Sequence, residues 1–151
     1  MLSSSLTMTG AQILEDLAHL GVAYALAFPI GWNREHHDRS AGVRTFPIVA
    51  IAACGLTLVM RSVPGVTPDS HSRVLQGLIT GIGFIGGGAI LRDVRGSVTG
   101  TATAASIWNI GIVGAATGFG LYHIAVVLAV INWLTLALLK PLKVSAPPPA
   151  E

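Results

Sequence analysis

The chain has 151 residues, of which 52% are hydrophobic and only 11% are charged. Nine lysines and arginines against seven aspartates and glutamates give a formal net charge of +2, too small and too scattered for a nucleic-acid-binding surface. This composition excludes an ordinary soluble protein and indicates an integral membrane protein embedded in the lipid bilayer.

The first half of the chain predicts two membrane-spanning helices joined by a charged loop. Residues 13–32 form an apolar segment of 20 residues, long enough to cross a bilayer as a helix. The loop that follows carries Arg34, Glu35 and Arg44. Between Arg44 and Arg61 the apolar segment has only 16 residues, so we expect a short second span whose flanking arginines reach the headgroups.

A third predicted span lies between Arg73 and Arg92 and is unusually rich in glycine. Asp69 is expected to cap this helix and to pair with Arg73 one turn later. Its six glycines fall on two broadly opposite faces, which hold Gly77, Gly81 and Gly88 on one side and Gly83, Gly86 and Gly87 on the other. Small residues let helices approach closely in a membrane, so we predict that this helix lies between two partners.

The last part of the chain predicts two more spans. Residues 96–139 contain no charged side chain, and these 44 residues are about twice what one span needs. Gly118-Phe-Gly120 is the expected turn, and Gly114 with Gly118 makes a further small-residue packing pair. We therefore expect a fourth span over residues 101–117 and a fifth over residues 121–139.

Taken together, the segments predict an all-α integral membrane protein with five transmembrane helices, tightly packed around the glycine-rich third helix. The expected divisions are an N-terminal tail over 1–12, the transmembrane domain over 13–139 and a Pro-rich cytoplasmic tail over 140–151. With the N-terminus outside, seven lysines and arginines lie on the inside segments and two on the outside segments. The positive-inside rule then places the C-terminus in the cytoplasm of a bacterial inner membrane.

Two patterns could indicate a cofactor or an ion pathway, but neither fits its context. Gly81-Ile-Gly83-Phe-Ile-Gly86 spells the G-x-G-x-x-G of dinucleotide-binding folds, yet no strand precedes it and no acidic residue follows about 20 positions later. A magnesium pathway would favour carboxylates at membrane depth, and no aspartate or glutamate lies deep in any predicted span. These contexts argue against nucleotide binding and, more weakly, against ion transport.

The histidines and the candidate catalytic groups give no site of their own. His36 and His37 lack a third metal ligand nearby, so they are expected to lie in a solvated loop. His19 and His123, near span ends, are expected to be interfacial or interhelical polar groups. No nucleophile and base can be paired from the sequence, so we expect a protein that is not an enzyme and carries no cofactor or metal.

Three blocks of sequence together resemble the membrane domain of the MgtC/SapB family. They are Gly31-Trp-Asn-Arg34-Glu35 followed by Ala41-Gly-Val-Arg44-Thr45; Asp69-x-x-x-Arg73 leading to Gly81-Ile-Gly-Phe-Ile-Gly-Gly-Gly88; and Gly100-Thr-Ala-Thr103-Ala-Ala-Ser-Ile-Trp108. Their order and spacing match the family from residue 17 to residue 139. The resemblance implies a bacterial inner-membrane protein of five helices without the soluble C-terminal domain that many members carry.

The resemblance also implies a function. Family members look like virulence-associated factors for growth in low magnesium and survival within host cells. The favoured hypothesis is regulation of a membrane ATPase, such as the ATP synthase; magnesium or other cation transport is the alternative, and a self-associating scaffold using Gly77, Gly81 and Gly88 is a third. The matched positions expected to serve as structural or partner-contact sites are Arg34, Glu35, Arg44, Thr45, Asp69, Arg73, Asp93, Thr103 and Trp108.

Overall fold

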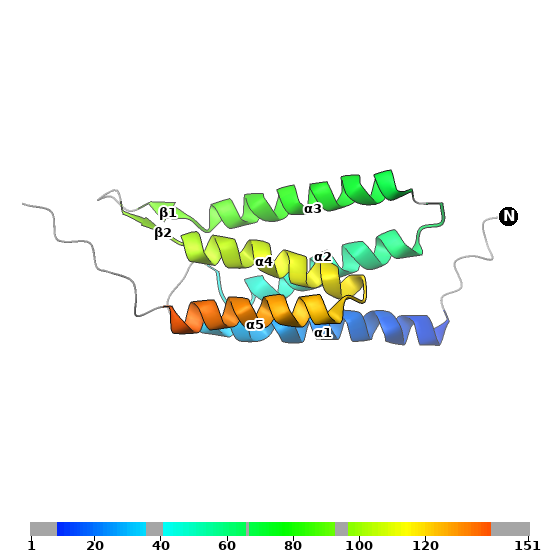
Figure 1. Ribbon diagram of the computed structural model, residues 1–151, viewed down its shortest axis with the longest axis horizontal. Helices are drawn as coiled ribbons and strands as arrows, with labels where there is room; N and C mark the ends of the chain where they lie inside the picture. Colours follow the sequence, from blue (N-terminus) through cyan, green and yellow to red (C-terminus); the bar gives the residue numbers. More distant parts are fainter. Residues whose placement is uncertain (1–8, 36–40, 66, 93–96, 140–151) are drawn as a thin grey trace, which may run out of the picture.

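The computed structural model describes residues 9–35, 41–65, 67–92 and 97–139. Within these residues the chain forms five α-helices that run back and forth along one elongated bundle (Figure 1). They are α1 (Gly10–Glu35), α2 (Thr45–Ser62), α3 (Pro68–Gly88), α4 (Thr101–Gly118) and α5 (Tyr122–Leu138). The prediction of an all-α protein with five helices is confirmed.

The helix boundaries follow from local capping and turn chemistry. Gly120 has φ 76°, the left-handed conformation that glycine adopts without a steric penalty, and it ends the turn between α4 and α5 as expected. The expected cap of α3 was wrong: the hydroxyl of Thr67 accepts the hydrogen bond from the Ser70 amide at 3.2 Å. Thr67 has the extended backbone of an N-cap, whereas Asp69 already lies within the first helical turn.

A short antiparallel hairpin connects α3 to α4, where a loop was expected. Strand β1 (Leu91–Arg92) pairs with β2 (Val98–Thr99), and Leu91 lies opposite Thr99. Gly100 follows with φ 90°, and a Cβ atom there would overlap the carbonyl oxygen of Ala89. The close return of the chain at this point therefore requires glycine.

The central helix is α4, which corrects the prediction that the bundle packs around the glycine-rich third helix. α4 contacts all four other helices, and 11 of its 18 residues are buried. By contrast, α3 buries only Ile82 and Gly86, packs mainly on α4 and scarcely touches α2. The glycines of α3 make the helix narrow, but large apolar side chains are what a core needs, and α3 offers few of them on any one face.

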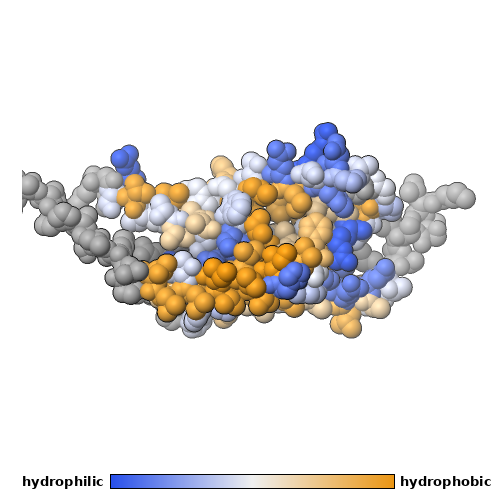
Figure 2. Space-filling model, viewed as in Figure 1, coloured by the Kyte–Doolittle hydropathy of each residue, from blue (hydrophilic) through white to orange (hydrophobic). Residues whose placement is uncertain are grey.

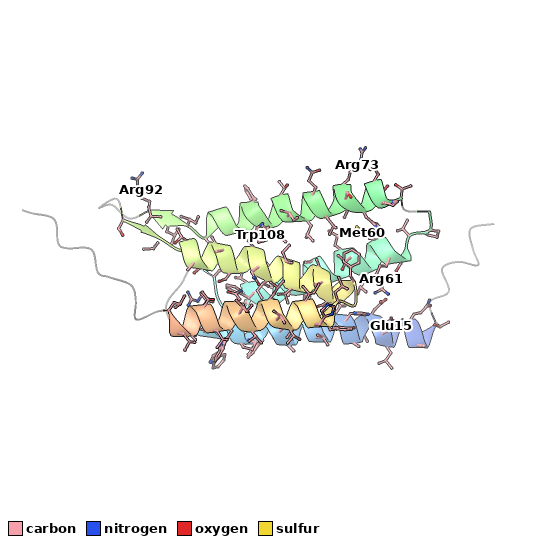
Figure 3. The ribbon with its side chains drawn as sticks, viewed as in Figure 1. Glu15, Met60, Arg61, Arg73, Arg92 and Trp108 are labelled. Carbon is pink, nitrogen blue, oxygen red and sulfur yellow. The ribbon has the colours of Figure 1, made fainter. Side chains whose placement is uncertain are left out.

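The remaining helices surround α4 and expose apolar side chains to the outside. Phe46, Ile30 and Ile107 are among the largest side chains that are fully buried in the core. α1 and α2 are long and apolar enough to cross a membrane, as judged by length and composition, and α5 is a shorter apolar helix. Hydrophilic residues gather mainly at the end where α1 and α3 begin, Arg92 lies at the other end, and the surface over α5 is largely apolar (Figure 2, Figure 3). Such an arrangement suits a bilayer.

Candidate functional site

The glycines of α4 are the closest points of contact between helices. A Cβ atom at Gly114 would overlap the carbonyl oxygen of Ala50 on α2, and one at Gly118 would overlap the hydroxyl of Thr57. On another side of α4, a Cβ at Gly111 would overlap the side chain of Ile82 from α3. Because these positions carry no side chain, α2 and α3 approach α4 closely. Small residues play the same part in other membrane bundles.

Most glycines of α3 have open surroundings. Only at Gly86 would an added Cβ lie close to another helix, 3.2 Å from the carbonyl oxygen of Ala104. At the other five, no atom of the described residues outside the local helix backbone would lie within 4 Å: Gly77, Gly81, Gly83, Gly87 and Gly88. Among the described residues, therefore, these five glycines make no close contact with another helix.

A groove of about 500 Å³ separates α2 from α3. Ala52, Ala53 and Leu56 line it on the α2 side, and Gly77 and Gly81 line it on the α3 side. The groove exists because α3 leans on α4 and leaves α2 uncovered along this side. Its small, apolar walls could accept an acyl chain or the side chains of another helix.

At one end of the bundle, the two parts of the first family block meet. The carboxylate of Glu35 accepts a hydrogen bond from the Val43 amide at 3.0 Å. A Cβ at Gly31 would lie 3.1 Å from the carbonyl oxygen of Gly42, so α1 closely approaches the backbone of the segment that precedes α2. Arg34 is only 7% exposed, and its guanidinium donates to the side chain of Asn33 at 2.9 Å. These residues fix the connection from α1 to α2.

The other residues expected as contact sites are spread over both ends of the molecule. Arg44 is exposed at the start of α2, where Thr45 begins the helix, and Thr103 is buried in the first turn of α4. Asp69 and Arg73 form an exposed ion pair of 3.9 Å at the opposite end, on α3. Trp108 is 45% exposed on α4. Asp93, His36 and His37 lie outside the described residues, so the structure does not gather the matched positions into one site.

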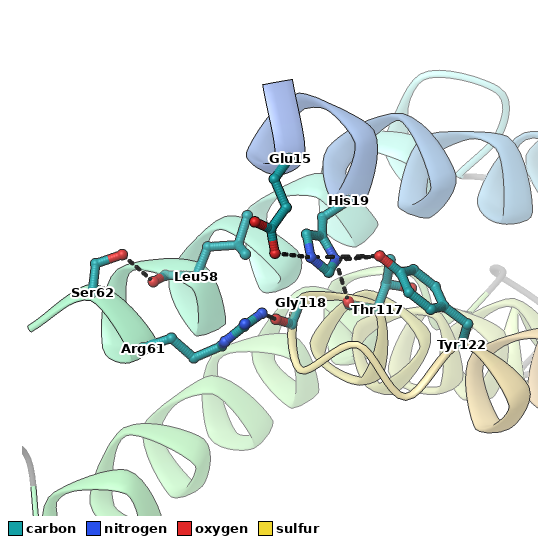
Figure 4. Close-up of polar contacts among 8 residues, drawn as sticks. All are labelled: Glu15, His19, Leu58, Arg61, Ser62, Thr117, Gly118 and Tyr122. Carbon is teal, nitrogen blue, oxygen red and sulfur yellow. Dashed lines mark hydrogen bonds and ion pairs between the residues drawn. The ribbon is translucent and has the colours of Figure 1, made fainter. Parts of the chain in front are cut away.

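A polar cluster that sequence reasoning missed closes the end of the bundle where α4 turns into α5 (Figure 4). The Nδ1 atom of His19 lies 2.8 Å from the carbonyl oxygen of Thr117 and 2.7 Å from the hydroxyl of Tyr122. Its Nε2 atom lies 3.7 Å from the carboxylate of Glu15, and the ring stacks on Tyr122. The expectation that His19 is an interhelical polar group is confirmed.

Arg61 completes this cluster from α2. Its guanidinium donates to the carbonyl oxygen of Gly118 at 2.8 Å (Figure 4). The last carbonyls of a helix have no partner within the helix. Backbone amides of the turn bond the carbonyls of Ala115, Ala116 and Thr117, and Arg61 bonds that of Gly118, while His19 adds a second contact at Thr117. The partners are far apart in sequence, which is why periodicity and local motifs did not reveal them.

Apart from Arg34 and His19 near the two ends of the bundle, the buried polar side chains are hydroxyls and an amide, and several of them bond between or within helices. The hydroxyl of Ser106 on α4 donates to the side-chain oxygen of Asn132 on α5 at 2.9 Å. Thr57 donates to the carbonyl oxygen of Cys54 at 2.8 Å, in its own helix. In the described part of the chain, no three histidine, cysteine, aspartate or glutamate residues are grouped so as to hold a metal ion. The core thus uses the polar contacts typical of membrane helices.

The bundle, its apolar exterior and the hydroxyl and amide contacts of its core define a helical membrane domain. Residues 20–145 match the model of the MgtC family. The chain belongs to that family, and it corresponds to the MgtC/SapB membrane domain.

Several curated relatives support this assignment. The chain is 34% identical to the protein SapB of Bacillus subtilis over 112 residues, which are 70% of this chain and 48% of SapB. It is 36% identical to the protein MgtC of Brucella abortus over 134 residues, 86% of this chain and 55% of that protein. The match to the protein SrpB of Synechococcus elongatus is 35% over 125 residues, 76% of this chain and 69% of SrpB. The chain spans about half the length of SapB and MgtC, and no solved structure matches it.

Proposed function

We propose that this protein is a regulator that docks on another membrane protein through its helices, and that it thereby supports adaptation to low magnesium and survival within host cells. Its target would be a membrane ATPase, such as the ATP synthase, or another determinant of ion homeostasis. The protein would cross the bacterial inner membrane five times, with its N-terminus outside and its C-terminus in the cytoplasm. No catalytic step by this chain is required.

The observation that carries this proposal is the incomplete coverage of α2 and α3. Elsewhere in the bundle, helices meet along glycine-lined contacts, as α2 and α4 do at Gly114. Between α2 and α3 the same kind of wall, built by Ala52, Ala53, Gly77 and Gly81, borders an open groove. A partner helix that inserts side chains there would bury apolar surface without displacing any contact of this chain.

A photo-cross-linking amino acid placed at Ala52 tests the proposal in native membranes. Ala52 is exposed and lines the groove, whereas Ile131 is an exposed apolar position on α5 and serves as the matched control. We expect the Ala52 variant to capture a subunit of a membrane ATPase or of an ion transporter, which is then identified by mass spectrometry. The Ile131 variant should capture mainly lipid.

Equal capture profiles from the two positions would contradict docking in the groove. The alternative function, cation transport, predicts a different result, because a transporter moves its ion without a protein partner. Vesicles that contain only the purified protein would then show magnesium flux. Such flux would replace the regulatory proposal with the transport one.

A further inference from the structure

The helix α3 has three faces with different surroundings. One contacts α4 through Ile82 and Gly86, and the second borders the α2–α3 groove with Gly77 and Gly81. The third face carries a row of exposed residues that we call the outer seam: Asp69, Arg73, Gln76, Thr80, Gly83 and Gly87. The outer seam is separate from the groove to which the proposed function assigns a partner.

The spacing of the outer seam is that of a helix-pairing face. Its residues follow one another at intervals of four, three, four, three and four positions. At about 100° per residue, such a heptad pattern keeps all six within roughly a quarter of the helix circumference. The seam therefore forms a straight line along α3, suited to a second helix crossing at about 20°.

We propose that the outer seam binds the outer seam of a second copy of this chain, with the two α3 helices parallel. Two copies inserted in the same membrane have the same orientation, so a two-fold axis along the membrane normal places equal residues at equal depth. Each residue of the seam must then be able to pack against the same seam of the other copy. The polar residue Gln76, the charged pair Asp69 and Arg73, and the small residues Gly83 and Gly87 each meet this requirement.

Gln76 supplies the polar part of this complementarity. Its side chain is exposed on the seam and forms no hydrogen bond within the described part of the chain. The hydroxyl of Thr80 is bonded at 2.8 Å to the carbonyl oxygen of Gln76, in its own helix. An amide is both donor and acceptor, so two Gln76 side chains facing each other across the axis would bond to one another. In a bilayer, no solvent competes for these groups.

Charge complementarity is provided by the first turn of the helix. Asp69 and Arg73 are 88% and 80% exposed, and they lie 3.9 Å apart within one chain. Arg73 points away from the rest of the bundle (Figure 3). In a parallel pair, the two Arg73 side chains lie at the same depth and the two Asp69 carboxylates lie one helical turn away. Each Arg73 can therefore reach the Asp69 of the other copy along the helix axis as well as its own. The four charges sum to zero at this end of the interface.

The C-terminal half of the outer seam, which contains Gly83 and Gly87, allows a second helix to approach closely. An added Cβ at Gly83 or Gly87 would meet no atom within 4 Å outside the local helix backbone in the described part of the chain. The surface at these positions is consequently backbone, which a second α3 can approach as closely as in small-residue helix dimers.

Cysteine cross-linking at adjacent positions tests the orientation of the pair. In a Cys54→Ala background, Thr80→Cys places a thiol on the seam, and Gly81→Cys places one at nearly the same depth on the groove face. Oxidation in native membranes should link Thr80→Cys into a disulfide dimer at least tenfold more completely than Gly81→Cys. A higher yield from Gly81→Cys, equal yields, or attachment of Thr80→Cys to a different protein would overturn the proposal.

A second pair of variants tests the strength of the association. Gly83→Leu blocks the seam, while Gly81→Leu adds the same side chain on the groove face. At both positions an added Cβ has no neighbour within 4 Å in the described part of the chain. Single-molecule photobleaching in liposomes at increasing lipid dilution should show a dimer for the unchanged protein and for Gly81→Leu. For Gly83→Leu we expect dissociation at about tenfold higher protein density in the membrane. A monomer at every density, or an unaffected Gly83→Leu dimer, would refute the proposed interface.

Discussion

His19 shows how a single polar side chain can hold several helices at the end of the bundle. It extends from α1, contacts the last turn of α4 and stacks on Tyr122 at the start of α5. Its neighbours Glu15 and Arg61 bring the ends of α1 and α2 to the same place. We infer that this cluster is structural, because its contacts join α1, α2 and the start of α5 to the buried C-terminal end of α4.

Removing one hydroxyl should measure this contribution. Tyr122→Phe keeps the ring stacked on His19 but loses the 2.7 Å contact of its hydroxyl with Nδ1. We expect the free energy of unfolding to fall by about 1 kcal/mol, the usual net value of one hydrogen bond. Tyr24→Phe is the control, because Tyr24 forms no hydrogen bond in the described residues and is 48% exposed. An equal effect of the two variants, measured by reversible unfolding in bicelles, would disprove this role of the hydroxyl.

At the scale of the helices, α4 organises the bundle because its small residues lie on two of its faces. Gly111 faces α3, while Gly114 and Gly118 face α2. The glycine-rich α3 has more glycines, yet most of them have no close neighbour in the described residues. Glycine content alone therefore does not determine which helix becomes central; what matters is whether the glycines lie where another helix comes close, as Gly111, Gly114 and Gly118 do.

Adding one methyl group should separate these two kinds of glycine. Gly114→Ala would force the new methyl against the carbonyl of Ala50, which cannot move without separating α2 from α4. We expect a loss of about 1–3 kcal/mol in the free energy of unfolding. Gly77→Ala, where no described residue would lie within 4 Å of the new methyl, should not lower it and should raise it by up to about 1 kcal/mol, because alanine favours the helix. Similar losses from both substitutions would show that the α2–α4 contact is not what makes Gly114 necessary.

The sequence was sufficient for the number of helices and their order, because both depend on local properties. Apolar length and the Gly118-Phe-Gly120 turn predicted that the fourth and fifth helices end at residues 117 and 139. In the structure, α4 ends at Gly118 and α5 at Leu138, each one residue away. Long-range contacts were not predictable in this way. His19 and Tyr122 are separated by 103 positions, and no local pattern indicates that one contacts the other. The same limit explains why α3 was wrongly placed at the centre.

For the molecule as a whole, the apolar surface over α5 and the hydrophilic residues at the ends suggest how it sits in a membrane (Figure 2, Figure 3). The α1–α2 connection and the α3–α4 hairpin lie at one end, and the α2–α3 and α4–α5 turns lie toward the other (Figure 1). We propose that the first end faces the cytoplasm, because most lysines and arginines of the predicted loops belong to it.

Labelling of single cysteines tests this orientation. Val63 and Val98 are both exposed, 50% and 53%, and they lie at opposite ends of the bundle. In a Cys54→Ala background, a membrane-impermeant maleimide should react with Val63→Cys in intact cells. It should react with Val98→Cys only after the inner membrane is permeabilised. The reverse pattern would invert the topology, and labelling of both in intact cells would rule out a span between them.

We propose that this protein acts by contacts between helices and not by moving ions, and flux measurements on liposomes that contain the purified protein alone distinguish the two. With imposed gradients of magnesium, sodium or protons, we expect fluxes equal to those of protein-free liposomes. A saturable flux that increases with the amount of folded protein in the liposomes would contradict it.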